Sequence, residues 1–314
     1  MSNAIVQAEQ ASGVAGVQVD PLSIHTGAEI SGVDLTQPLA DGQVAAIRAA
    51  LLRWKVVFFR DQPLDHGQHV AFARQFGEVT IGHAVYGHVE GHPAVYSVHK
   101  HRADSRYQGQ PMVAPWTGWH TDISAAHNPP AASILRGVTV PPYGGDTQFT
   151  NLVAAYHGLS EPLRAFLEGL RGIHAFEPPE GTRSSTEFDD VHARRRMVTE
   201  HPLVRRHPET GEPILFVSPG FLKSIAGLAP RESQKLMELL WEHAIRPEYT
   251  VRFRWAPGSI AFWDNRSTAH LPPRDIFDSE FDRQLYRVTL VGDVPVGVDG
   301  RPSTALEGEQ ILAV

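Results

Sequence analysis

The sequence predicts a mainly β fold with flanking helices, an all-β barrel or jelly roll. Short apolar runs cluster late in the chain, at 214–217, 250–255, 259–265 and 285–293, and Pro and Gly turn signals separate them. Helical periodicity is concentrated earlier, so strands and helices do not alternate as βαβ units would require. The sequence also has no internal repeat and no Gly-rich phosphate loop. We therefore expect helices packed around β-sheets.

The elements of the first third can be placed from local signals. Residues 41–54 carry apolar side chains at helical spacing, and Asp41 is the expected N-cap. The apolar run at 54–60 follows as a buried strand. Asp65 is expected to cap a second short helix that Gly77 ends. Together these signals predict a helix, strand and helix in succession.

Two further amphipathic helices are predicted at 160–173 and 230–245. We expect both to pack outside a sheet. The residues that the second helix should bury are Leu236, Leu239, Leu240 and His243.

Composition excludes several classes of function. The 314 residues include 28 Lys and Arg against 35 Asp and Glu, and the resulting net charge of −7 disfavours nonspecific binding to nucleic acid or anionic membranes. The chain has no cysteine, which excludes disulfides, Fe–S clusters, thiolate zinc sites and a cysteine nucleophile. Any metal ion must therefore be held by His, Asp or Glu.

The expected organisation is one domain with short extensions. Residues 1–16 are predicted to be a flexible leader, 17–295 the domain, and 296–314 a C-terminal extension. Two long polar stretches, 99–118 and 177–200, are candidates for active-site lids. No signal peptide and no apolar stretch of membrane-spanning length is present, so a cytoplasmic location is expected. Exposed helices leave a homodimer or homotetramer open.

The most informative local feature is the segment Trp119-His120-Thr121-Asp122. On an extended strand, side chains two positions apart point to the same face, so His120 and Asp122 could share one ion. A second candidate ligand, His270, ends the segment WDNRSTAH at 263–270. Two imidazoles and one carboxylate form the arrangement of non-haem Fe(II) oxygenases, which leaves open positions for oxygen chemistry.

Taken alone, a His-x-Asp triplet is a weak signal in a chain with 17 histidines. A strand-end histidine bonded to its neighbour is the commoner case. The histidines that we interpret as loop or outer-shell residues are His127, His174, His201 and His207. The flanking motifs favour the metal interpretation for His120, Asp122 and His270.

In its ordered motifs the sequence resembles the taurine dioxygenase (TauD/TfdA) family of Fe(II)- and 2-oxoglutarate-dependent dioxygenases. The resemblance runs from about Ile24 to Asp293. The motifs that carry it are VVFFRDQ at 56–62, WHTD at 119–122, GGDT at 144–147, WDNR at 263–266, His270 and RVTLVGD at 287–293. It implies a double-stranded β-helix, also called a distorted jelly roll, with His120, Asp122 and His270 as iron ligands at its mouth.

A co-substrate that chelates iron through its 2-oxo acid end needs its distant carboxylate held, and a guanidinium can do this with two charge-assisted hydrogen bonds. Arg283 is the candidate, and the resemblance implies that it shares this role with Thr147. By the same resemblance, Arg287 and His83 match residues that bind the sulfonate of taurine, although His83 aligns only with one inserted residue. Alternatively, Arg283 is a surface arginine, Thr147 a turn residue and His83 a loop residue.

The resemblance implies hydroxylation of a small anionic substrate, coupled to conversion of 2-oxoglutarate and O2 to succinate and CO2. An alkyl sulfonate or sulfate ester is the expected substrate, and it would give an aldehyde plus sulfite or sulfate. The segment at 124–127, SAAH, stands where taurine-type members carry a bulkier Thr-Phe pair, and Trp116 stands where they carry a small polar residue. Together these differences suggest a wider or more apolar pocket. The aromatic residues expected to line that pocket are Phe176, Phe216 and Phe221, with core packing as the alternative for at least one.

Two other hypotheses stay open. One keeps the chemistry but replaces the substrate with a carboxylate-bearing natural product or a phenoxy-acid-like compound. The other is a zinc hydrolase or a metal-stabilised binding barrel that uses the same ligands. That last hypothesis has no distinct general base near Asp122 and no role for Arg283.

Overall fold

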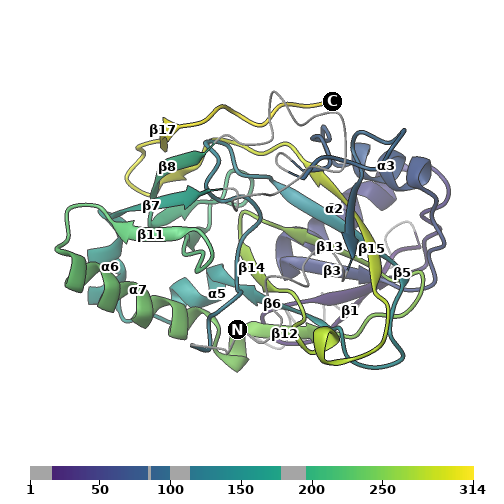
Figure 1. Cartoon of the computed structure of the whole chain (residues 1–314), viewed down its shortest axis with the longest axis horizontal. Coiled ribbons are helices and arrows are strands. Elements are labelled where there is room, and N and C mark those ends of the chain that lie inside the picture. The colour runs from purple at the N-terminus through teal and green to yellow at the C-terminus, as the bar shows by residue number, and fades with distance from the viewer. Residues whose placement is uncertain (1–15, 84–85, 100–113, 178–195) are drawn as a thin grey trace.

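The computed structural model of the chain describes residues 16–83, 86–99, 114–177 and 196–314. Within these residues the architecture is mainly β: strands form four sheets, and helices cover their outer faces (Figure 1). The two predicted lid stretches fall largely at 100–113 and 178–195, which lie outside the described residues, as does nearly all of the predicted leader.

In the described part of the chain the largest sheet has seven strands, of which the second and third pair in parallel and the other neighbours pair antiparallel. In spatial order they are β1 (Gln18–Pro21), β2 (Ala28–Ser31), β3 (Val56–Phe59), β13 (Ile260–Asp264), β5 (Ala132–Thr139), β15 (Gln284–Leu290) and β4 (Tyr96–His99). The strands predicted at 54–60, 259–265 and 285–293 are confirmed as β3, β13 and β15, with slightly different ends.

Helices α2 (Asp41–Trp54) and α3 (His66–Arg74) cover one face of this sheet (Figure 1). The predicted bounds of α2 are confirmed, but its N-cap is Ala40 rather than Asp41, and the Gln43 side chain accepts from the backbone N–H of Ala40. Asp65 caps α3 as predicted, since its carboxylate accepts from the N–H of Gln68 at 2.7 Å.

The opposite face packs against a second, three-stranded sheet. Its strands are β12 (Thr250–Phe253), β6 (Thr147–Asn151) and β14 (Thr268–Leu271). Phe58 of β3 stacks on Phe253 of β12 with ring centroids 4.0 Å apart, and Phe149 of β6 packs edge-on against Phe58. Alternation along each strand therefore sends one set of side chains toward the helices and the other into the space between the two sheets.

The remaining sheets form a second body of structure beside the sandwich (Figure 1). One contains β11 (Leu222–Ile225), β7 (Arg171–Phe176), β8 (Met197–Pro202) and β17 (Thr304–Glu307), and the other contains β10 (Pro213–Leu215), β9 (Val204–Arg206) and β16 (Val296–Gly297). The helices here are α5 (Leu152–His157), α6 (Glu161–Glu168) and α7 (Pro230–Ala244). The connections before β12 and after β14 contain two short 3-10 turns, η2 (Pro247–Tyr249) and η3 (Asp275–Asp278).

Two expectations about these helices are wrong in part. The helix predicted at 160–173 ends at Glu168, and residues from Arg171 onward form β7, because Gly169 caps the helix and the chain then enters a sheet. In α7, Leu240 is buried as expected, but Leu239 is 49% exposed and Met237 and Trp241 are buried in its place.

The C-terminal residues 296–314 are built into the sheets. Strand β16 pairs with β9, β17 pairs with β8, and Ala313 forms an isolated bridge with Thr80. Residues 197–200, the end of the second predicted lid, belong to β8. Nowhere in the described ranges does a helix have the length and apolar character needed to cross a bilayer.

Candidate metal centre and substrate cavity

The two candidate histidine ligands face each other across an antiparallel bridge. The His120 N–H donates to the His270 carbonyl at 2.9 Å, and the His270 N–H donates back to the His120 carbonyl at 2.7 Å. His270 lies on β14, whereas His120 belongs to no named strand. The expectation that His120 and Asp122 share an extended strand is wrong, because Asp122 lies in a turn and Ile123 has a φ of 42°.

The turn nevertheless brings all three predicted ligands together. Asp122 Oδ1 lies 3.9 Å from His120 Nε2 and 4.0 Å from His270 Nε2, and one ligand atom from each residue lies within 4.8 Å of the others. Asp122 is 3% exposed and His270 is 7% exposed. This donor set could hold a metal ion and matches the two-histidine, one-carboxylate pattern.

The protonation states of these groups suit a divalent cation. Burial lowers the pKa of His120, and it lowers the pKa of His270 to about 3, so both rings are neutral at pH 7. His120 Nδ1–H donates to the Gly118 carbonyl at 3.0 Å, which leaves the Nε2 lone pair facing Asp122. Burial raises the pKa of Asp122, but Arg287 and the two imidazoles lower it further, so the carboxylate is ionised. The site therefore offers deprotonated ligands, as metal binding requires.

Arg287, on β15, lies beside this carboxylate. Its guanidinium donates to Asp122 Oδ1 at 2.5 Å and lies over the ring of Tyr96, with Cζ 5.3 Å from the ring centroid. The Nε atom is buried and has no hydrogen-bond partner among the described residues. One donor of a buried guanidinium thus remains unused at the edge of the cavity.

A cavity of about 430 Å³ opens next to the three ligand groups. Arg283 and Thr147 line it together with Arg287. Arg283 is 7% exposed, donates from Nε to the Gly145 carbonyl at 3.1 Å, and makes no ion pair with any described residue. Burial lowers its pKa to about 10, so it remains charged at neutral pH. A buried cation without a carboxylate partner favours binding of an anion from outside.

The predicted substrate residues fall into two groups. His83, Phe176 and Phe221 line the cavity. Phe216 does not: it is 0% exposed and stacks on His174 with ring centroids 4.9 Å apart. Trp116 also lies elsewhere, packed against Trp241 at 5.7 Å. The predicted cavity role of Phe216 and Trp116 is therefore wrong, because both rings pack inside the second body instead.

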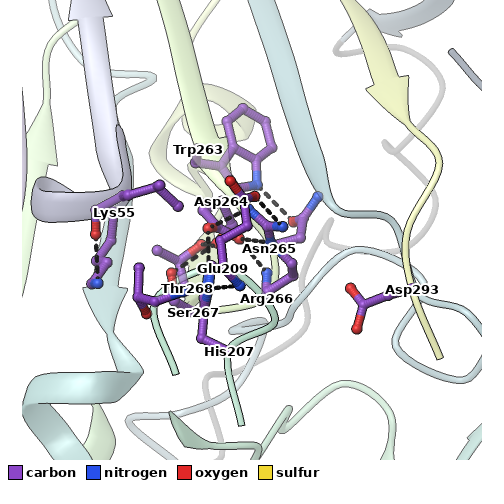
Figure 2. A network of polar contacts seen from close by, with 12 residues as sticks. Lys55, His207, Glu209, Trp263, Asp264, Asn265, Arg266, Ser267, Thr268 and Asp293 are labelled. Carbon is purple, nitrogen blue, oxygen red and sulfur yellow. Dashed lines mark hydrogen bonds and ion pairs between the residues drawn. The ribbon is translucent and has the colours of Figure 1, made fainter. Parts of the chain in front are cut away.

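The segment that leads to His270 is held by a buried polar network (Figure 2). Arg266 donates to both oxygens of Asp264, at 2.9 and 3.0 Å, and to Glu209 at 2.7 Å. His207 Nε2–H donates to Asp264 at 2.8 Å, and Thr268 donates to the Asp264 carbonyl at 2.8 Å. Burial raises the pKa of Asp264, but Arg266 and His207 lower it further, to well below its usual value. The network fixes the turn between β13 and β14.

The four histidines set aside in the sequence do not join the metal group. His174 and His201 lie on β7 and β8 and are fully buried, so the loop alternative is wrong for both, whereas the prediction that neither is a metal ligand agrees with the ligand group. His207 belongs to the network around Asp264, and His127 lies close to the Ser303 carbonyl, with 3.3 Å from Nε2 to the oxygen.

Sequence reasoning missed several residues around the site. Tyr86 and Tyr96 line the cavity, and Ser133 donates to Asp122 Oδ2 at 2.7 Å. Ser133 is the polar residue among Ala132, Ile134 and Leu135 at the start of β5, and a polar residue at a buried strand position is a detectable signal. Tyr86 and Tyr96 carry no comparable signal, because their neighbours in sequence are ordinary loop and strand residues.

A mainly β sandwich with a His–Asp–His centre at the mouth of a cationic cavity defines a metal-dependent oxygenase. Comparison with known proteins agrees. The family model described as "Taurine catabolism dioxygenase TauD, TfdA family" matches residues 18–289. The chain belongs to this family, and it is a non-haem dioxygenase that depends on Fe(II), 2-oxoglutarate and O2.

Individual relatives cover most of the chain. An alpha-ketoglutarate-dependent sulfate ester dioxygenase of Pseudomonas putida is 40% identical, over 91% of this chain and 93% of the relative. An alkylsulfatase of Acinetobacter baylyi is 35% identical, over 90% and 88%. The crystal structure of a taurine dioxygenase from Burkholderia xenovorans is 64% identical with a TM-score of 0.84, covering 94% of this chain and 96% of the other.

Proposed function

We propose that this dioxygenase hydroxylates a carbon of an alkyl sulfate ester or alkyl sulfonate. The observation that carries the proposal is the pairing of two buried arginines, Arg283 and Arg287, in one cavity with the His–Asp–His group. One cation serves the co-substrate and the other serves the substrate. The names of the sulfate ester dioxygenase and the alkylsulfatase among the relatives support this choice of substrate.

His120, Asp122 and His270 are the proposed iron ligands, supported by their convergence and by the neutral state of the imidazoles. When bound, Fe(II) supplies activation of O2 coupled to the decarboxylation of 2-oxoglutarate to succinate. The protein positions both organic molecules and keeps water out. Packing of Trp263 and Phe149 against the His270 ring, at 5.0 and 5.9 Å between centroids, supports that role.

Arg283 and Thr147 are proposed to hold the distant carboxylate of 2-oxoglutarate. Arg283 keeps its charge while buried, and only its Nε is used by a carbonyl of the protein. Thr147 Oγ1 accepts from the indole N–H of Trp255 at 3.0 Å, so its own hydroxyl hydrogen is free to donate to the carboxylate. A guanidinium and a hydroxyl together satisfy several carboxylate lone pairs.

Arg287 and His83 are proposed to bind the sulfate or sulfonate group. Phe176 and Phe221, whose rings lie 5.9 Å apart, are proposed to contact the alkyl part of the substrate. Hydroxylation of the carbon next to the ester oxygen replaces C–H by C–OH. The C–O bond to sulfate then breaks, the hydroxyl proton is lost, and the products are an aldehyde and sulfate.

We also propose a specific topology and domain organisation for the chain. The facing sheets, the antiparallel pairing and the relatives favour a double-stranded β-helix, or jelly roll, within a single domain over 17–295. An assembly of two or four copies stays a prediction.

The test is a panel of alkyl sulfates, alkyl sulfonates, taurine and phenoxy acids, assayed for succinate together with sulfate or sulfite. Succinate formation that depends on an alkyl sulfate or alkyl sulfonate, with equimolar release of sulfate or sulfite, supports the proposal. Turnover of phenoxy acids alone would favour the alternative substrate class, which two relatives named 2,4-dichlorophenoxyacetate dioxygenases represent. A separate anaerobic titration with Fe(II) and 2-oxoglutarate distinguishes the dioxygenase from a zinc hydrolase, because only the former gives a charge-transfer absorption.

A further inference from the structure

A directional chain of hydrogen bonds runs from the strand before the His270 segment to the carboxylate ligand. Trp263 Nε1–H donates to Asn265 Oδ1 at 2.8 Å (Figure 2), Asn265 Nδ2–H donates to Ser133 Oγ at 2.8 Å, and Ser133 Oγ–H donates to Asp122 Oδ2 at 2.7 Å. All four residues are at most 3% exposed. Water therefore does not replace a missing partner in this chain.

The direction of the chain follows from its first member. An indole N–H can only donate, so the oxygen of the Asn265 amide must face Trp263 and its NH2 must face Ser133. One lone pair of the Ser133 hydroxyl is then occupied. Its single hydrogen is left for Asp122.

That hydrogen bond gives the two carboxylate oxygens of Asp122 different partners. Oδ2 accepts from Ser133, whereas Oδ1 accepts from Arg287 and faces the imidazoles of His120 and His270 at 3.9 and 4.0 Å. The terminal torsion of an aspartate is soft, and Arg287 alone, bonded to one oxygen, would leave the carboxylate able to turn about that contact. Sheet register keeps the donor in place, because Ser133 pairs directly with Trp263 on one side and with Thr289 on the other.

We propose that Trp263, Asn265 and Ser133 are positioning residues that hold Asp122 with Oδ1 toward the metal ion. This inference rests on the proposed ligand role of Asp122. Hydrogen-bond partners of metal ligands typically contribute 10- to 100-fold in metal affinity. The same turn that carries Asp264 and Arg266 thus links His270 to the carboxylate ligand through Asn265.

The experiment measures Mn(II) affinity of the purified full-length chain by electron paramagnetic resonance, with the thermal midpoint of the metal-free protein beside it. Ser133→Ala should weaken Mn(II) binding by about 10- to 100-fold. Asn265→Leu should weaken it less, because the hydroxyl keeps its hydrogen and loses only its orientation. The double variant should bind no more weakly than Ser133→Ala alone, since the two residues act in series.

Thr289→Val is the matched control. Thr289 lies opposite Ser133 on β15, is 2% exposed, and its hydroxyl has no partner among the described residues. Its variant should keep Mn(II) affinity within twofold of the wild type. A Ser133→Ala protein with wild-type affinity, or one whose loss matches that of Thr289→Val, overturns the proposal. If Asp122→Asn itself leaves Mn(II) affinity unchanged, the ligand assignment fails instead, so the two failures are distinguishable.

Discussion

His120 and His270, 150 positions apart in the sequence, form a two-way backbone hydrogen-bonded pair, and their rings lie 4.2 Å apart between centroids. The pair fixes the separation of the two imidazoles through the backbone rather than through side-chain contacts. A ligand site built on such a bridge is rigid before any ion binds. The third ligand, Asp122, is the member whose orientation depends on side chains.

Asp122→Asn should abolish measurable Fe(II) and Mn(II) binding and all turnover. The amide keeps the shape of the side chain but removes the negative charge that attracts the cation. Metal content after anaerobic loading and succinate formation are the measurements. Asp299→Asn, which changes an exposed carboxylate paired with Arg301, is the control and should bind metal normally. Full activity in the Asp122 variant would refute its ligand role.

Arg283→Ala should raise the KM for 2-oxoglutarate by at least about 10-fold, since a hydrogen bond to a charged group contributes about 1.5 to 3 kcal/mol. The concentration of Fe(II) needed for half-maximal activity should change far less. Arg252→Ala removes an arginine that is exposed on β12 and provides the control. Equal increases in both requirements would contradict the proposed carboxylate role.

Phe221 and Phe216 look alike in the sequence, but the structure gives them different roles. Phe221→Ala should raise the KM for the organic substrate while changing stability little, because the ring lines the cavity. Phe216→Ala should lower the free energy of unfolding by about 3 to 5 kcal/mol, because that ring is fully buried. Steady-state kinetics and urea unfolding of both variants provide the check. If Phe221→Ala instead lowered the stability and Phe216→Ala raised the KM, the assignment of Phe221 to the cavity wall would be wrong.

These phenylalanines also show how far sequence reasoning reaches. Periodicity located α2, and the capping signal of Asp65 located the start of α3, because both depend on neighbours within a few residues. The sequence predicts that an apolar residue is buried. Which residue it packs against depends on a sheet formed by distant parts of the chain. For that reason the motifs identified His120, Asp122 and His270, whereas the fate of Phe216 and Trp116 was decided by long-range packing.

The central strand β5 was missed for the same reason. It lies between β13 and β15 and is buried on both faces along most of its length. Its sequence, ASILRGVT, has no alternation of polar and apolar residues and contains an arginine and a glycine. The turn at Asp122 was also beyond reach, since the positive φ of Ile123 carries no sequence signal in a β-branched residue.

Stability should fall as the pH drops below about 6.5, in part because of His69. Burial lowers the pKa of His69 to about 3 in the folded state, whereas an exposed histidine has a pKa of about 6.5. Between these values the unfolded chain binds one more proton, so the folded state loses up to about 1.4 kcal/mol per pH unit as the pH falls. Above pH 7 the contribution is constant.

His69→Gln should flatten this dependence, because glutamine does not take up a proton in this pH range. Its amide can still donate to the Ile134 carbonyl, which Nε2 of His69 contacts at 3.2 Å. Urea unfolding at pH 7.5, 6.0 and 5.0 measures it. The difference in unfolding free energy between variant and wild type should shift in favour of the variant at the lower pH. Parallel curves for the two proteins would show that His69 is protonated in the folded state or not the source of the slope.

Arg266→Met should lower the free energy of unfolding by about 3 to 5 kcal/mol, because it leaves the buried carboxylate of Asp264 without its bidentate partner. Arg246→Met breaks an exposed pair with Glu248 and should change stability by less than about 1 kcal/mol. Because the network also fixes the turn that leads to His270, metal affinity of the Arg266 variant should fall as well.

Replacing Asp264 and Arg266 together by Asn and Met removes both charges of the ion pair. A recovery of stability in that double variant would confirm that the unpaired carboxylate, rather than lost packing, causes the defect of the single variant. If the double variant is as unstable as the single one, the ion pair is not what holds the turn.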